Sequence, residues 1–282
     1  MRTPQVSADS NSLRSTQRYW DAAAETYAKK FSGTTVGRAR RKGVWHELER
    51  AFKPGQHILE LNCGTGIDAV FLARKGIRIL ACDIAPRMIE LARELAAESQ
   101  SATPPDFRIL ATENLATLRN EGPFDGAFSN FSGLNCVDNL SQVAIDLEAL
   151  LKPRARLLIC MMGRFVPWEI MGFLAQGKPR QALMSLVNEQ TPYGSNNDLR
   201  VQRPNKAMIT RQMAPAFRLV GWKGIGLTVP PSYSERWAHH FPRLIDRLAA
   251  IDHHIGHLPL FRNMGDCVLL EFERRETNVH VS

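Results

Sequence analysis

The chain has 282 residues, of which 44% are hydrophobic, enough for a sizeable core, so a globally disordered protein is excluded. Its formal net charge is +8, but the lysines and arginines are spread along the chain, which favours a solvated basic surface over a nucleic-acid-binding module. The five cysteines include no C-x-x-C pair, and four of them lie beside or within apolar runs, which argues against a disulfide framework or a zinc knuckle.

The N-terminal residues 1–15 are rich in Ser, Thr and Asn and are predicted to form a disordered tail. They contain no apolar stretch of the kind found in signal peptides, and no run in the chain approaches the about 20 apolar residues that span a bilayer. We therefore expect a reducing, cytoplasmic setting and no transmembrane segment. Two helices are predicted next, over 16–31 and 41–52, the second ending before Pro54.

From residue 57 onward, short apolar segments alternate with longer helical ones. This alternation is typical of βαβ units, which build a parallel sheet with helices on both faces. The predicted strands are 57–62, 77–83, 106–111, 124–130 and 155–162, followed after an interruption by 217–231 and 266–275, and the predicted helices are 66–76, 85–99, 138–153 and 235–255.

The interruption covers residues 164–205 and is predicted to be an insertion. Its first part is apolar and helical, and a polar loop is predicted over 191–206. We interpret the insertion as a lid over a small, largely hydrophobic ligand, with an ordinary packed helix pair as the alternative. The apolar side chains of the proposed lid are Phe165, Trp168, Ile170, Met171, Phe173, Leu174, Met184 and Leu186.

A glycine turn follows the first strand of the predicted sheet, in the stretch HILELNCGTGIDA. Gly64, Gly66 and Ala69 form the pattern G-x-G-x-x-A, which holds the adenosine of either a dinucleotide or S-adenosylmethionine. Glu60 favours S-adenosylmethionine over a dinucleotide, because a carboxylate here would repel a pyrophosphate but attract a sulfonium and an ammonium. Asp83 ends the second strand, where it is expected to accept hydrogen bonds from ribose hydroxyls, to cap the next helix, or both.

Four segments in this order, ILELNCGTG, ILACDIAPRMIELAR, FDGAFSN and LKPRARLLI, resemble the successive motifs of class I S-adenosylmethionine-dependent methyltransferases of the small-molecule type. The resemblance covers residues 19–163, and two later segments resemble the family's last two strands. It implies an α/β, Rossmann-like fold with a seven-stranded, mostly parallel sheet in the order 3-2-1-4-5-7-6, strand 7 antiparallel. It also implies one domain over 16–282, in which helices within 16–53 cover the cofactor and 164–205 form the lid.

The resemblance assigns cofactor contacts along the glycine loop and the second strand. Glu60, Gly64 and Gly66 are expected against the methionine half of S-adenosylmethionine. The residues expected around the ribose and the adenine are Asp83, Ile84 and Met88.

Further contacts are implied on either side of this loop. Asn130 and Phe131 are expected beneath the methionyl group and the transferable methyl. The aromatic N-terminal helix would cover the cofactor through Tyr19 and Tyr27, for which plain core packing is the alternative. A basic residue, Arg41 or else Arg38, would neutralise the methionine carboxylate.

The chain departs from the family pattern at two places. Asn62 stands where the loop usually has its first glycine, and asparagine tolerates the left-handed backbone that such a turn needs. After the third strand, Ala111 stands where an acid often contacts the adenine amino group. Thr112 or Glu113 is expected to substitute for that acid.

The expected function is methyl transfer from S-adenosylmethionine to an O, N or C nucleophile of a small, apolar metabolite, with S-adenosylhomocysteine as the cofactor product. Because the sulfonium is already a strong electrophile, holding the acceptor in line can supply most of the catalysis. No catalytic residue is assigned; His239, His240 and Tyr233 are candidates. The expected partner is the acceptor itself, with no nucleic acid.

Several alternatives remain open at this point. An RNA or protein methyltransferase is weakly favoured by the positive net charge, although no appended nucleic-acid module is found. An NAD-dependent oxidoreductase would share the glycine loop, and a non-catalytic binding protein could retain a cofactor site. No metal is expected, because the clustered histidines lack an accompanying carboxylate or thiol pattern. These histidines are His239, His240, His253, His254 and His257.

Overall fold

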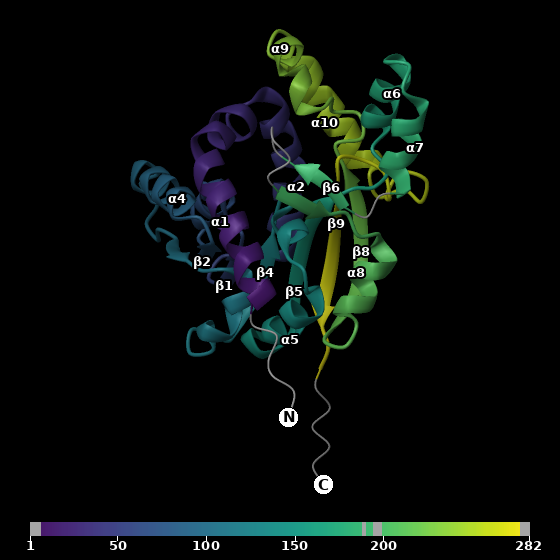
Figure 1. Ribbon diagram of the computed structural model, residues 1–282. Helices are drawn as coiled ribbons and strands as arrows, with labels where there is room; N and C mark the ends of the chain where they lie inside the picture. Colours follow the sequence, from purple (N-terminus) through teal and green to yellow (C-terminus); the bar gives the residue numbers. More distant parts are fainter. Residues whose placement is uncertain (1–6, 188–189, 194–198, 277–282) are drawn as a thin grey trace, which may run out of the picture.

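A computed structural model of the protein describes residues 7–187, 190–193 and 199–276, and a seven-stranded sheet runs through its centre (Figure 1). The strand order is β3-β2-β1-β4-β5-β9-β8, in which β9 is antiparallel to both of its neighbours and the first five strands are parallel. The predicted order is thus confirmed, with β8 and β9 as the sixth and seventh strands. The strands are β1 (His57–Leu61), β2 (Arg78–Asp83), β3 (Asp106–Ile109), β4 (Phe124–Ser129), β5 (Leu151–Met162), β8 (Phe217–Ile225) and β9 (Cys267–Arg274).

Helices cover both faces of this sheet. They are α2 (Thr35–Ala51), α3 (Ile67–Ala73) and α4 (Pro86–Glu98) on one face, and η2 (Thr112–Leu118), α5 (Leu140–Leu150) and α8 (Lys206–Met213) on the other. Side chains alternate along β1, so Ile58 packs with the first group of helices, whereas Leu59 and Leu61 pack with the second. Glu60 therefore lies on the same face as Ile58.

The N-terminal helix α1 (Ser7–Tyr27) begins earlier than expected, so residues 7–15 are helical, and the prediction of a disordered tail over them is wrong. The physical reason is a set of contacts that composition does not reveal. Leu13 is half-buried, Thr16 is buried, and the Ser12 hydroxyl donates to the carboxylate of Asp138 at 3.3 Å. Residues 1–6 lie outside the described part of the chain.

A π-helical turn, η1 (Ala28–Ser32), joins α1 to α2. The second helix also starts earlier than predicted, because the hydroxyl of Thr34 accepts a hydrogen bond from the backbone N–H of Gly37 at 2.9 Å and caps it. It ends at Ala51, just before Pro54, as predicted.

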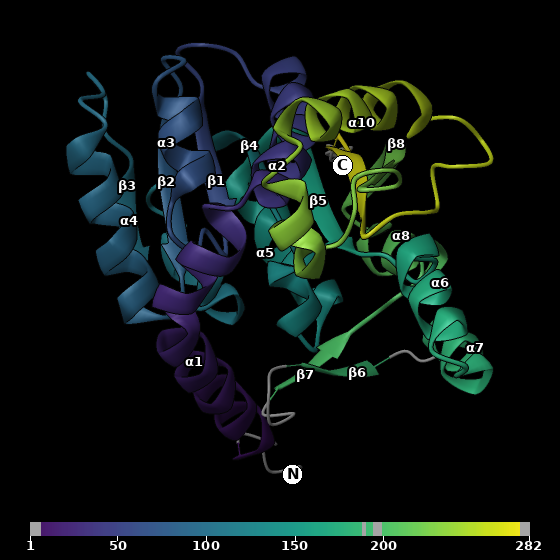
Figure 2. The same ribbon diagram turned by 90° about the horizontal axis from the view of Figure 1, so that it is seen from above.

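The insertion after β5 has two parts. A helical hairpin, α6 (Pro167–Ala175) and α7 (Pro179–Val187), projects away from the sheet, and the antiparallel pair β6 (Gln190–Tyr193) and β7 (Leu199–Gln202) lies between it and α1 (Figure 2). The predicted polar loop over 191–206 therefore contains a hairpin. Leu199 and Val201, two residues apart on β7, share one buried side, and this alternation stabilises the strand.

The C-terminal helix predicted over 235–255 is divided. A short turn, η4 (Ser232–Ser234), leads into α9 (Glu235–Ala238), and α10 (Pro242–Ile255) starts separately, because proline fits the first turn of a helix but not its interior. Along the described ranges, no helix combines the length and the apolar character needed to cross a bilayer.

Candidate active site

The loop between β1 and α3 turns through three left-handed residues, Asn62 (φ 54°), Gly64 (φ 53°) and Gly66 (φ 73°). Gly64 borders a cavity of about 660 Å³, open mouth included, at the carboxyl ends of β1, β2 and β4. A side chain at Gly64 would enter this cavity, since its Cβ would lie 3.9 Å from Tyr27 Cε1 and 4.0 Å from Met88 Sδ. We call this space the loop cavity.

Nine of the fourteen predicted cofactor-binding residues line the loop cavity. They come from segments far apart in the chain, as parallel strands ending at one edge of a sheet require. These nine are Tyr27, Arg41, Asn62, Gly64, Asp83, Ile84, Met88, Asn130 and Phe131.

Asp83 supports the local structure around the loop, but it is not the N-cap of α4, which is Ala85 without a side-chain cap, and its contact with ribose hydroxyls stays a prediction. Its carboxylate accepts hydrogen bonds from the backbone N–H groups of Gly64 (2.8 Å) and Ala85 (2.9 Å), so it fixes the glycine loop and the start of α4. Burial raises the pKa of Asp83, and the hydrogen bonds from Ala85, Gly64 and Ile84 oppose that rise. An ionised carboxylate has about four acceptor positions, so further ones remain on the cavity side.

Asp68, in the first turn of α3, organises the wall of the loop cavity and was missed at the sequence level. Its carboxylate forms an ion pair with Arg41 (2.7 Å) and accepts hydrogen bonds from Trp45 Nε1 (2.6 Å) and Asn130 Nδ2 (3.0 Å). Burial disfavours the charge on Arg41, but Asp68, Tyr27 and Glu60 together outweigh this effect, so the pKa of Arg41 is raised. The Arg41 guanidinium carbon also lies 4.7 Å from the centre of the Phe131 ring.

Arg38, the alternative to Arg41, lies elsewhere. Its side chain is exposed, and its guanidinium donates to the carbonyl of Gly33 at 2.6 Å. Of the two basic residues considered, Arg41 is therefore the one that reaches the loop cavity.

Glu60 is not on the cavity wall, which corrects the expectation of direct contact with the cofactor. Its side chain is 1% exposed and lies behind the loop, on the face of β1 covered by α2, α3 and α4. Burial raises the pKa of Glu60 well above its usual value, the Asp68 charge adds to this, and Arg41 opposes it. Glu60 thus contributes to the electrostatics of the site from behind the wall.

Asn62 stands in place of the usual glycine, and its side chain bridges the start of helix η2 and the end of strand β4. Its amide nitrogen donates to the Thr112 hydroxyl (3.0 Å), and its amide oxygen accepts from the Ser129 hydroxyl (3.2 Å). Thr112 therefore supports Asn62 and does not line the loop cavity, and Glu113 is exposed. Gly133 packs directly against Asn62, because a Cβ at Gly133 would lie 2.3 Å from the Asn62 Cβ.

Gly66 also lies off the cavity wall. A Cβ there would come within 2.7 Å of the Ala92 Cβ and 2.8 Å of the Phe107 ring, so this glycine lets the loop pack against α4 and β3. Trp20 and Thr16 of α1 also line the cavity, and neither was among the predicted contacts. The signal for Trp20 lay in the aromatic run of that helix.

A second, larger cavity of about 1460 Å³, open mouth included, adjoins the first and shares Trp20, Tyr27 and Phe131 with it. Its wall is mainly apolar, and Tyr19 and Tyr233 contribute to it. We call it the outer cavity. Tyr19 thus lines the outer cavity and not the loop cavity, where it was expected to contact the cofactor.

The charged groups of the outer cavity are largely paired. Arg40 contacts the Asp266 carboxylate at 2.5 Å, and Glu169 contacts Arg203 at 3.4 Å. His239 and His240 are exposed and line neither cavity, so the structure does not support them as catalytic candidates.

The predicted lid residues do not face the outer cavity. From the insertion, Val166, Glu169 and Val201 reach its wall, and none of the eight apolar residues selected from the sequence does. The reason is that the α6–α7 hairpin projects outward, which leaves Met171, Leu174 and Met184 exposed.

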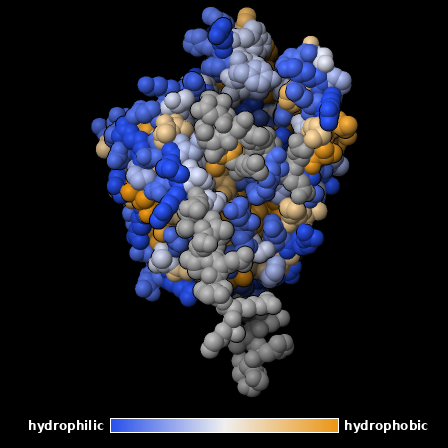
Figure 3. All heavy atoms as spheres, in the orientation of Figure 1, coloured by the Kyte–Doolittle hydropathy of each residue, from blue (hydrophilic) through white to orange (hydrophobic). Residues whose placement is uncertain are grey.

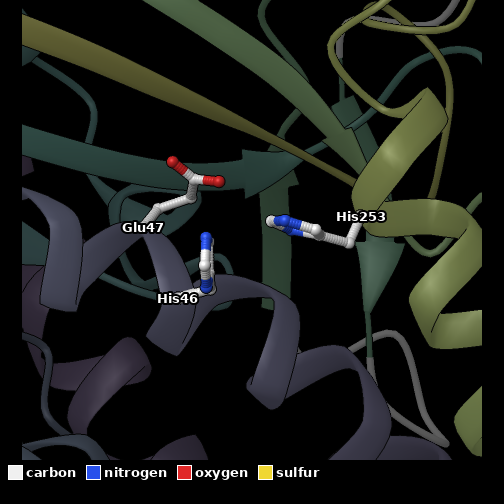
Figure 4. Close-up of side chains that lie close together, drawn as sticks. All are labelled: His46, Glu47 and His253. Carbon is white, nitrogen blue, oxygen red and sulfur yellow. The ribbon is translucent and has the colours of Figure 1, made fainter.

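One group with the side chains of a metal site occurs among the described residues. His46 and Glu47 of α2 and His253 of α10 point toward one another, with donor atoms within 4.8 Å (Figure 4). The Glu47 carboxylate, however, already accepts from Lys223 Nζ (2.8 Å) and Arg50 Nε (2.9 Å). A carboxylate held by two cations is poorly placed to bind a third, so we interpret this group as an ion-pair network joining α2, β8 and α10.

Comparison with known proteins agrees with this geometry. Residues 58–154 match the family model described as a methyltransferase domain. The ubiquinone biosynthesis O-methyltransferase of Xanthomonas campestris pv. campestris is 30% identical over 121 residues, covering 41% of this chain and 46% of that protein. The enzyme of the same description from Xylella fastidiosa is 34% identical over 110 residues, covering 39% and 43%. The chain thus spans less than half the length of the curated relatives it matches.

Solved structures extend the similarity of fold to nearly the whole chain. Magnesium protoporphyrin IX methyltransferase from Synechocystis PCC 6803 with bound SAH has a TM-score of 0.58 at 16% identity, covering 94% of this chain and all of that one. The 1,6-didemethyltoxoflavin-N1-methyltransferase of Burkholderia thailandensis has a TM-score of 0.56 at 13% identity, covering 98% and 94%. Residues 58–154 thus match a methyltransferase domain, and the fold of the chain is similar to that of solved methyltransferases.

Proposed function

We propose that the protein transfers the methyl group of S-adenosylmethionine to a small, largely apolar acceptor. The observation that carries this proposal is the junction of the two cavities at Trp20, Tyr27 and Phe131. A cofactor held in the loop cavity would be separated from an acceptor in the outer cavity only by these aromatic side chains. Such an arrangement can bring an acceptor nucleophile close to a methyl donor.

The loop cavity suits a ligand with a zwitterionic amino-acid end. Arg41 Nε and Asn130 Oδ1 are both buried and have no hydrogen-bond partner within the described ranges. These atoms offer a donor for a carboxylate and an acceptor for an ammonium. The carboxylates of Asp68 and Asp83 on the wall would favour a cationic sulfonium nearby.

The adenosine part of the cofactor also has matching groups. Asp83 offers acceptors for two ribose hydroxyls, and Met88 and Ile84 form an apolar surface for adenine. The space at Gly64 supports close approach of the ligand to the loop backbone.

A dinucleotide fits this site less well. Its pyrophosphate would meet the wall of the loop cavity, where the two carboxylates of Asp68 and Asp83 face the single guanidinium of Arg41. We therefore favour S-adenosylmethionine over NAD. Glu60 is proposed to influence the electrostatics of the site without contacting the cofactor.

The acceptor is proposed to be a metabolite with an O, N or C nucleophile. The names of the matched relatives and the mainly apolar wall of the outer cavity favour an oxygen nucleophile on a hydrophobic molecule. Tyr233 lines this cavity and is a candidate for contact with the acceptor. Positioning supplies the catalysis, and an acceptor with an acidic hydroxyl group needs little help in losing its proton.

Calorimetry with S-adenosylhomocysteine and with NAD tests the proposal. We expect binding of the former, weakened about tenfold or more by Asp83→Asn, since hydrogen bonds to charged groups contribute about 1.5–3 kcal/mol. Asp246→Asn, at an exposed pair with Lys42, is the matched control and should leave binding unchanged. Binding of NAD without binding of S-adenosylhomocysteine would overturn the proposal.

Mass spectrometry then tests the acceptor. Candidate hydrophobic metabolites incubated with protein and S-adenosylmethionine should gain one CH2 group. Methylation of RNA or proteins, with no small molecule modified, would instead support the alternative methyltransferase classes. Cofactor binding without any methylated product would support the binding-protein alternative.

A further inference from the structure

Exposed apolar side chains are concentrated at one end of the protein. Ten of the sixteen large hydrophobic residues that are exposed within the described ranges lie in two short segments, 165–187 and 233–244. Helix α6 has no buried residue although its sequence is largely apolar, so it presents apolar side chains to its surroundings. The ten residues are Phe165, Met171, Leu174, Leu183, Met184, Val187, Tyr233, Trp237, Phe241 and Leu244.

These segments form two prominences beside the mouth of the outer cavity. One is the α6–α7 hairpin, and the other runs from η4 through α9 to the start of α10; both rise from the end of the molecule where β5 ends (Figures 1 and 2). They meet at Gly172, where a Cβ would lie 3.6 Å from the Tyr233 hydroxyl. Hydrophobic surface lies beside hydrophilic atoms on the α6–α7 hairpin (Figure 3).

The acidic residues of the two prominences are already engaged. Glu169 contacts Arg203 (3.4 Å), Asp246 contacts Lys42 (2.8 Å), and Glu235 accepts hydrogen bonds from the backbone N–H groups of residues 35 and 36 (2.7 and 3.0 Å).

The cations of the same prominences have no acidic partner among the residues that the structure describes. The charge left unbalanced at this end is therefore positive, and the chain as a whole carries +8. The cations are Lys178, Arg180, Arg236, Arg243 and Arg247.

We propose that this end of the protein binds the surface of a lipid bilayer that contains anionic lipids. Exposed Trp, Phe, Leu and Met side chains next to basic residues are typical of segments that lie in a membrane interface. The apolar side chains would enter the boundary between headgroups and acyl chains, and the unpaired cations would contact the headgroup charges.

A second copy of the chain fits this surface less well. A twofold contact would place the same unpaired cations of both copies against one another, with no acidic group free to balance them. A nucleic acid would match the charge but not the exposed aliphatic side chains, which offer no hydrogen bonds and no stacking surface.

Membrane binding would also bring the outer cavity to the source of an apolar acceptor. The cavity lies between the prominences, because Glu169 and Val166 come from one of them and Tyr233 from the other. An acceptor dissolved in the bilayer could then enter without crossing water. This last consequence rests on the proposed function, whereas the membrane contact itself does not.

Sedimentation of the full chain with vesicles tests the inference. We expect binding to vesicles of phosphatidylcholine and phosphatidylglycerol, weaker binding to phosphatidylcholine alone, and a decrease with added salt. Leu183→Glu, at a side chain 62% exposed, should weaken binding about tenfold or more. Ile145→Glu, at a side chain 54% exposed on α5, is the matched control and should bind as the unmodified protein does.

A charge variant separates the two contributions. Arg243→Gln should lower affinity for the anionic vesicles about fivefold and leave binding to neutral vesicles unchanged. Calorimetry with S-adenosylhomocysteine on each variant should give unchanged affinity, because these positions lie off the loop cavity.

Several outcomes would overturn the inference. One is that the protein does not bind anionic vesicles, and another is that Leu183→Glu binds them as tightly as the unmodified protein. A third is that the protein does not bind vesicles but self-associates, and that Leu183→Glu abolishes this self-association. Retention of RNA with no affinity for vesicles would have the same effect. Loss of vesicle binding with intact S-adenosylhomocysteine binding contradicts only this inference, whereas the reverse result contradicts only the proposed function.

Discussion

Replacing Asp68 with Asn would remove the charge that balances Arg41 and keep the shape of the side chain. Asp68 is 3% exposed, and its carboxylate is shared by Arg41, Trp45 and Asn130. Breaking a buried ion pair by removing one partner costs about 3–5 kcal/mol. The asparagine oxygen can still accept one hydrogen bond, so we expect a loss of about 3 kcal/mol, at the lower end of this range.

Urea denaturation followed by tryptophan fluorescence measures this loss. The midpoint should fall without a change in slope, because the surface exposed on unfolding stays the same. Asp246→Asn, whose partner Lys42 is about equally exposed, should change stability by less than about 0.5 kcal/mol. Adding Arg41→Met to Asp68→Asn should recover part of the loss. A loss below about 1 kcal/mol for Asp68→Asn would refute the view that this carboxylate neutralises Arg41.

Three further predictions concern the loop and the carboxylate behind it. Gly64→Ala should fold, with a loss of stability of about 1 kcal/mol caused by its left-handed backbone. In calorimetry it should lose affinity for S-adenosylhomocysteine, because the added methyl group enters the loop cavity. Unchanged affinity would place the cofactor elsewhere. Gly66→Ala should lower the melting temperature more than Gly55→Ala. Both glycines have a positive φ, but of the two only Gly66 would bring an added Cβ within 3 Å of neighbouring atoms. Equal decreases in melting temperature would contradict this reasoning. The folded-state pKa of Glu60 lies above its ordinary value of 4.5, so its favourable contribution is present below pH 4.5 and is lost as the pH rises through the folded pKa. Relative to Glu60→Gln, the unmodified protein should therefore lose stability with rising pH in denaturation curves, by up to about 1.4 kcal/mol per pH unit, whereas parallel curves would speak against a raised pKa.

The strand order could be predicted from the sequence because it depends on the alternation of strands and helices along the whole chain. An error at the end of one element does not change that alternation. Apolar strands separated by helices of suitable length leave few topologies, and the resemblance of the motifs selected one of them. The division at Pro242 and the hairpin at β6–β7 depend on a single proline and on two alternating side chains, Leu199 and Val201. Such short-range features are easily assigned to a longer helix or to a loop.

The site was predicted unevenly for a related reason. Side chains at strand ends, such as Asp83 and Asn130, reach the cavity because the edge of the sheet forms its floor. Glu60 lies inside a strand, where the alternation of side chains places it on the same face as Ile58, and that face is buried. Asp68 was missed because its importance comes from three partners that only the folded chain brings together.

The insertion shows the limit of composition as a guide. Its apolar residues suggested a lid, but composition does not tell whether an apolar helix faces a cavity inside the protein or a surface outside it. Helix α6 has no buried residue, and Met171 and Leu174 are exposed.

The close packing of Asn62 against Gly133 makes the two positions dependent on each other. A Cβ at Gly133 would lie 2.3 Å from the Asn62 Cβ, so each position limits the size of the other. Relatives that have glycine at the first position of the loop are released from this constraint, and we expect them to carry larger residues at the position equivalent to Gly133. The two positions should therefore covary in an alignment. We expect a side chain at either position only where the other is glycine.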